Sequence, residues 1–176
     1  MIRITPQLCR SCLATIGLTT LVACALTPSS APAAKEATRL AMHVRASTAN
    51  NPDEKGRAGP VMVRIYELRN EAGFEGADYF SLDTKDHTIL AQDILARDAF
   101  ILRPGEFRDL ERKMNPETMA LGILIGYRDL GKAKWRAVYR LPPAPEAAWY
   151  RMAIPLRKVK LEILLDQQNI LITKVD

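Results

Sequence analysis

The stretch VMVRIYEL, residues 61–68, decides the fold class of this chain. In an extended chain, alternate residues from Val61 to Ile65 fall on one face, and they are apolar. The opposite face also holds large apolar side chains, Tyr66 and Leu68. A strand that is apolar on both faces is typical of the middle of a buried sheet. The sequence therefore predicts a central β-strand here.

Alternating segments continue on both sides of this stretch. Residues 107–114 also fit a helical period, but the neighbouring strands favour a strand there. Residues 119–127 (MALGILIGY) form the most apolar run and contain Gly122 and Gly126, which suggests a bulge or a close backbone approach. Strands are expected at residues 38–47, 61–68, 100–102, 107–114, 119–127, 134–141, 158–165 and 170–175.

The period of two is lost only around residues 73–96. Phe74 to Leu82 and Ile89 to Leu95 fit two short helical pieces better than strands. Seven or eight short strands separated by turn residues, with one small helical insertion, predict an all-β antiparallel sandwich.

The segment between the first two strands is a long polar loop. Residues 48–59 read TANNPDEKGRAG and contain no large apolar side chain. Twelve residues are more than a simple hairpin needs, and loops of this length on rigid scaffolds often bind other molecules. A solvated loop without a partner is the alternative interpretation.

The first 23 residues have the features of a secretory leader. Arg3 and Arg10 make the start basic, and residues 12–23 (CLATIGLTTLVA) are mostly apolar. This run is too short to span a bilayer, which takes about 20 apolar residues. The stretch then ends in Leu21, Val22, Ala23 and Cys24, which resembles the lipobox recognised by the lipoprotein signal peptidase.

The lipobox implies that Cys24 becomes the first residue and carries a diacylglycerol on its sulfur and an acyl chain on its amine. The alternative is an ordinary signal peptide with Cys24 as a passenger. Two or more acyl chains anchor a protein stably. Ala25 is not the aspartate that favours inner-membrane retention of Gram-negative lipoproteins, so we expect an outer-membrane anchor facing the periplasm.

The remaining chain divides into a tether and a domain. Residues 24–36 are rich in Pro, Ser and Ala and have no hydrophobic period, which is typical of a flexible tether. Residues 37–176 would form the sandwich. Cys9 and Cys12 leave with the leader, so the domain has neither a thiol nor a disulfide.

Little in the sequence favours catalysis. His43 and His87 lie on different predicted elements without metal-ligand spacing, and His43 falls on the polar face of its strand. No G-x-S-x-G or phosphate-binding glycine motif is present. We therefore expect no enzyme, no metal, no cofactor beyond the covalent lipid and no small-molecule substrate.

The charge pattern does not predict nucleic-acid binding either. The formal charge of the whole chain is +5, and two of these positive charges, on Arg3 and Arg10, leave with the leader. No basic stripe with interleaved aromatic residues appears. Strand alternation instead places most of a basic cluster on a solvated face; its members are Arg128, Lys132, Lys134, Arg136 and Arg140.

An ordered set of short matches behind the lipobox resembles the TssJ family, the outer-membrane lipoproteins of type VI secretion systems. It covers most of the mature domain. The matching segments are Gly56-Arg57, Pro60–Leu68, Phe74, Asp78–Leu82, Leu90, Asp93, Phe100, Arg103–Glu106, Tyr127–Leu130 and Trp135-Arg136.

The resemblance implies a transthyretin-like β-sandwich and a structural role. A TssJ protein holds the periplasmic C-terminal domain of TssM, the inner-membrane component, and the loop between its first two strands contributes to binding. That loop corresponds by position to residues 48–59. Its candidate contact residues are Asn50, Asn51, Asp53, Glu54, Lys55 and Arg57. A periplasmic lipoprotein that inhibits a toxin or hydrolase remains the alternative.

Overall fold

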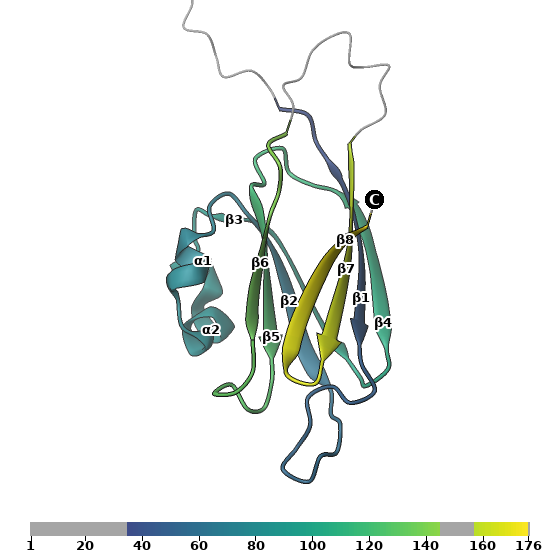
Figure 1. The fold of residues 1–176 in the computed structure, drawn as a ribbon. Coiled ribbons are helices and arrows are strands. Elements are labelled where there is room, and N and C mark those ends of the chain that lie inside the picture. The colour runs from purple at the N-terminus through teal and green to yellow at the C-terminus, as the bar shows by residue number, and fades with distance from the viewer. Residues whose placement is uncertain (1–34, 145–156, 176) are drawn as a thin grey trace, which may run out of the picture. The chain divides into compact units, whose positions relative to one another are not determined.

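Eight strands and two short helices form the part of the chain that the computed structural model describes, residues 35–144 and 157–175 (Figure 1). The elements are β1 (Arg39–Ala46), β2 (Val61–Leu68), α1 (Ala72–Gly76), α2 (Tyr79–Ile89), β3 (Ile94–Leu102), β4 (Phe107–Lys113), β5 (Ala120–Gly126), β6 (Arg136–Arg140), β7 (Lys158–Asp166) and β8 (Asn169–Val175). The predicted β-sandwich with a small helical insertion is confirmed.

The strands form two four-stranded sheets, in the orders β4-β1-β7-β8 and β3-β2-β5-β6. All pairs are antiparallel except β1 and β7, which run parallel with Arg39 opposite Lys158. The stretch that decided the fold class, β2, lies between β3 and β5 as predicted. Both helices cover the outer face of its sheet (Figure 1).

Each face of β2 belongs to a different hydrophobic core. Val61, Val63 and Ile65 pack between the sheets with the alternate residues of β1, β5 and β7. Tyr66 and Leu68 pack instead against the helices. The two layers account for the unusually apolar character of this strand, because burial removes both faces from water.

The helical prediction for residues 89–95 is wrong. α2 ends at Ile89, and β3 begins at Ile94, so the helical insertion stops short of the predicted residue 96 and the strand predicted at 100–102 is longer. Short apolar runs fit both periods, and here pairing with β2 decides. The preference for a strand over a helix at residues 107–114 is confirmed by β4.

A charged contact joins the two sheets at their β3–β4 side. The carboxylate of Glu67 on β2, 1% exposed, lies 2.8 Å from the guanidinium of Arg112 on β4. Its other oxygen accepts from the Thr118 hydroxyl and the Asn115 backbone N–H. The buried charge is therefore paired and hydrogen-bonded.

Neither described helix has the length and apolarity to cross a membrane.

Candidate functional site

Four connections meet at one end of the sandwich, among them the β3–β4 turn, whose Gly105 N–H donates to the carbonyl of Ser47. The long β1–β2 loop, residues 48–59, extends beyond the strands beside the β5–β6 and β7–β8 turns (Figure 1). Residue 35, where the described chain begins, precedes the start of β1 at the other end. Eight residues of β1 separate the two ends by about 26 Å. The loop is therefore presented away from the point where the chain enters the domain.

Two asparagines fix the base of the β1–β2 loop. Asn50 and Asn51 are 0% and 3% exposed. The Asn51 side chain donates to the carbonyl of Pro60 at 2.6 Å and accepts from the backbone N–H of Arg128 at 2.9 Å. Its φ of 51° lies in the left-handed region that asparagine tolerates better than most residues. The loop base is thereby tied to the β5–β6 turn.

These positions correct the expectation that Asn50 and Asn51 contact a partner. Both side chains are used inside the domain, since Asn50 also donates to the carbonyl of Gly59 at 3.4 Å. A buried amide has no surface to offer to another protein. The two residues therefore position the loop, and the contact candidates reduce to its tip.

Asp53 organises the tip of the β1–β2 loop. One carboxylate oxygen accepts from the backbone N–H groups of Lys55 and Arg57, both at 2.9 Å. The other accepts from the Arg57 guanidinium at 2.8 Å. Gly56, with φ 75°, supplies the turn between them. The N–H and guanidinium donors of Arg57, with the N–H of Lys55, hold the pKa of Asp53 below its usual value.

The tip exposes charges of both signs. The side chain of Arg57 is 74% exposed, whereas that of Asp53 is only 15% exposed. Glu54 and Lys55 are exposed as well. The structure therefore brings Asp53, Glu54, Lys55 and Arg57 together at the tip, with Asp53 facing inward and the other three outward.

A polar hollow of about 770 Å³ lies beside the tip. It is lined by Pro52, Asp53, Glu54, Lys55, Arg57, Arg128, Asp129, Lys132 and Gln168. Four of these side chains are cationic and three are anionic, a composition that suits polar contacts with a protein surface. Salt bridges hold some of these charges in place: Lys132 lies 3.3 Å from Asp129.

Sequence reasoning missed the contributions of the other two turns to this hollow. Arg128 and Lys132 were predicted only as solvated basic residues, and Gln168 was not singled out. In the structure, a Cβ at Gly59 would lie 3.0 Å from the Arg128 guanidinium. That close approach is a tertiary contact that no local pattern reveals.

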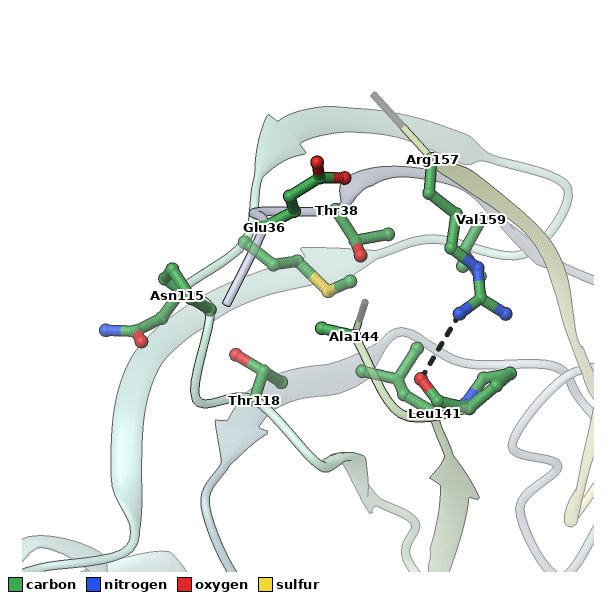
Figure 2. Close-up of a pocket in the computed structure, with 11 residues that line it drawn as sticks. Glu36, Thr38, Asn115, Thr118, Leu141, Ala144, Arg157 and Val159 are labelled. Atoms are coloured by element: carbon green, nitrogen blue, oxygen red, sulfur yellow. Dashed lines mark hydrogen bonds between the residues drawn. The ribbon is translucent and has the colours of Figure 1, made fainter. Parts of the chain in front are cut away.

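At the opposite end of the sandwich, the described residues form a pocket of a different kind. A small pocket lies between the segments before β1, after β4 and after β6 and the start of β7 (Figure 2). Arg157 crosses it and donates to the carbonyl of Pro142. The pocket has a volume of about 10 Å³, which is at the lower limit for one water molecule.

No metal centre is visible in residues 35–144 and 157–175, where no three His, Cys, Asp or Glu side chains gather. His43 lies on the outer face of β1 as predicted, with its Nδ1 2.6 Å from Asp109 and its side chain 41% exposed. The leader, Leu21, Val22, Ala23 and Cys24 lie outside the described residues.

The comparisons with known proteins identify the family. A profile of the family described as "Type VI secretion lipoprotein, VasD, EvfM, TssJ, VC_A0113" matches residues 38–168. The chain belongs to this family. The predicted resemblance to TssJ is thereby confirmed.

Solved structures agree with the family assignment. The type VI lipoprotein TssJ1 from Pseudomonas aeruginosa is 35% identical, with a TM-score of 0.70 over 80% of this chain and 98% of that chain. A chain of a structure named "Type VI membrane complex" is 26% identical, with a TM-score of 0.62 over 80% of this chain and 100% of that chain.

The lipoprotein Lip from Serratia marcescens, a membrane-bound component of the type VI system, shares the fold. It is 24% identical, with a TM-score of 0.68 over 80% of this chain and 100% of that chain. No curated protein sequence matches the chain. This TssJ-family chain is thus a type VI secretion lipoprotein with a β-sandwich domain.

Proposed function

We propose that this TssJ-family protein, acylated at Cys24, is a structural adaptor at the periplasmic face of the outer membrane. It holds the periplasmic C-terminal domain of TssM through the tip of the β1–β2 loop. The observation that carries the proposal is the braced, exposed tip at the end of the sandwich away from residue 35. Family membership and the similarity to a chain of a type VI membrane complex support the role.

The bracing of the loop suits a docking device. Asn51 ties its base to Arg128, and Asp53 closes its tip, so little conformational entropy is left to lose on binding. Charged contacts of the kind that Glu54, Lys55 and Arg57 offer favour specificity and association rate. A rigid platform with a polar tip needs no reactive group to work as an adaptor.

The orientation of the domain fits an outer-membrane anchor. The predicted lipid on Cys24 lies only eleven residues before Lys35, and Lys35 precedes the end of the sandwich opposite the loop. An anchor there leaves the loop tip free to face the periplasm and an inner-membrane partner.

Calorimetry between residues 25–176 and the periplasmic domain of TssM from the same organism tests the adaptor role. The informative variant is Glu54→Ala with Lys55→Ala, because these exposed residues leave the bracing by Asn51 and Asp53 intact. We expect saturable binding by the unmodified protein and a loss of affinity of about tenfold or more in this variant.

The matched control is Glu75→Ala with Lys85→Ala, which removes the same charges from the helices. It should bind TssM like the unmodified protein. Equal binding by both variants would keep the adaptor role and move the site away from the loop. Absence of binding, with both proteins folded, would contradict the role and favour an inhibitor of a toxin or hydrolase.

The lipid anchor has its own test. Cells grown with labelled palmitate should label the full-length protein and its Cys12→Ser variant, whereas Cys24→Ser should remain unlabelled and leave the membrane fraction. Cys12 is the matched control because it lies in the predicted leader. Label that persists in Cys24→Ser would contradict anchoring at this residue.

A further inference from the structure

Three cations stand in one row across the outer face of the sheet β4-β1-β7-β8. The strand register places Arg39 opposite Lys113 on one side and opposite Lys158 on the other. All three are exposed. We call Arg39, Lys113 and Lys158 the tether-end row, because they occupy the end of the sandwich where the described chain begins.

Such a row costs stability. Residues directly opposite each other in neighbouring strands have Cβ atoms about 5 Å apart, and like charges there repel. One carboxylate offsets the repulsion in part: Glu111, in the next row, lies 3.0 Å from the Lys158 ammonium and also faces Arg39. One anion among three cations leaves an excess of positive charge.

More cations lie around the tether-end row. Lys160 follows Lys158 on the same face of β7 and is exposed. Arg157 lies at the same end and donates to the carbonyls of Pro142 and Pro143. Lys35 lies near Glu117, and Glu36 adds a further acid at this end. Among the described residues at this end, six cations face three acids: Arg39, Lys113, Lys158, Lys160, Arg157 and Lys35 against Glu111, Glu117 and Glu36.

The rows farther along the sheet differ in charge. Asp109, His43 and Glu162 make the third row acidic, and its histidine is paired with Asp109. In the fourth row the exposed Arg45 stands opposite Phe107 and Leu164. Among the described residues, the clustered cations of this face lie at the end where the described chain begins, and Arg45 is a single cation at the other end.

We propose that the tether-end row docks on the anionic phospholipid headgroups of the membrane that holds the lipid anchor. This inference depends on the proposed anchor only for which end of the domain faces the membrane. Cations within a Debye length of an anionic bilayer are attracted to it, by about fivefold in partitioning for each Lys or Arg. Contact would hold the sandwich upright with the β1–β2 loop directed away from the lipid.

Vesicle co-sedimentation of the unacylated residues 25–176 tests the inference. Residues 25–176 contain the whole described domain, and 98% of the crystallised relative TssJ1 from Pseudomonas aeruginosa aligns with this chain. A thermal unfolding scan first establishes that the unacylated protein is folded. The vesicles contain phosphatidylethanolamine and phosphatidylglycerol in a ratio of about two to one, or phosphatidylethanolamine and neutral phosphatidylcholine in that ratio. We expect salt-sensitive binding to the anionic vesicles alone.

The informative variant is the triple substitution Arg39→Gln, Lys113→Gln, Lys158→Gln. It should weaken binding by about tenfold or more, while its unfolding midpoint stays equal or rises because like charges have been removed. The matched control, Lys55→Gln, Lys132→Gln, Lys134→Gln, lowers the net charge equally at the loop end and should bind within about twofold of the unmodified protein.

Equal losses in the two variants, or no binding by the unmodified protein at low salt, would overturn the inference. The triple variant of the tether-end row should still bind the TssM domain. Failure of lipid docking and failure of the adaptor role are therefore seen in separate measurements.

Discussion

Asn51 is the residue on which the geometry of the β1–β2 loop depends most. Replacing it with alanine removes two hydrogen bonds, leaves the part-buried N–H of Arg128 without its acceptor, and places at φ 51° a residue that tolerates this backbone less well than asparagine. We expect Asn51→Ala to lower the free energy of unfolding by about 2–4 kcal/mol, measured in urea. Lys55→Ala, on the exposed tip, should stay within about 0.5 kcal/mol.

The variant Asn51→Gly separates the two causes of this loss. Glycine accepts the left-handed backbone but makes no side-chain hydrogen bonds, so its stability should fall between those of the unmodified protein and Asn51→Ala. Equal stability of Asn51→Ala and the unmodified protein would contradict the bracing role.

Asp53 gives the loop tip a dependence on pH. Its pKa is held below the ordinary 3.8, so its stabilising contribution is present above that value and is lost as the pH falls through the lowered pKa. An NMR titration of the Arg57 amide should therefore have a midpoint below 3.8. Asp53→Asn should abolish the titration, and a midpoint above 3.8 would contradict the described hydrogen bonds.

At this scale the sequence predicted the location of the loop but not the roles of its residues. Asn50 and Glu54 are both polar residues in a polar segment, and only the fold shows that the first is buried and the second exposed. The partner of Asn51 lies 77 residues farther along the chain. Local patterns carry no information on such contacts.

At the scale of elements, Gly122 on β5 lets the helical layer approach the sheet. A Cβ at this position would lie 3.0 Å from Leu68 and from the ring of Phe74 on α1. We expect Gly122→Ala to cost about 1–3 kcal/mol of unfolding free energy through overpacking. Gly76→Ala is the control, since nothing lies within 4 Å of its Cβ, and it should be neutral or slightly stabilising. Equal stabilities would contradict close packing of α1.

Strands with a buried face were predictable for a physical reason. Burial of alternate residues in β1, β2 and β7 follows directly from a period of two that the core imposes. β3 was partly missed because Ile94 and Leu95 are adjacent and half-buried, which hides the alternation. The parallel pairing of β1 with β7 depends on long-range topology and had no local signal.

For the whole molecule, the two ends of the sandwich carry different features. The tether-end row lies at the end where the described chain begins, and the braced tip of the β1–β2 loop lies at the other. The sandwich class was predictable from strand number and turns, whereas the partner came only from the family resemblance. The tether-end row required the strand register, because its members are 45 residues or more apart in the chain.

The most direct measurement is site-specific photo-crosslinking in living cells that assemble the secretion system. A photoreactive amino acid at Lys55, on the loop tip, should form a covalent adduct with TssM. The same group at Lys85, on the exposed side of α2, should not. An adduct from position 85 but none from position 55, in cells whose complex has assembled, would contradict the claim that the loop end holds TssM.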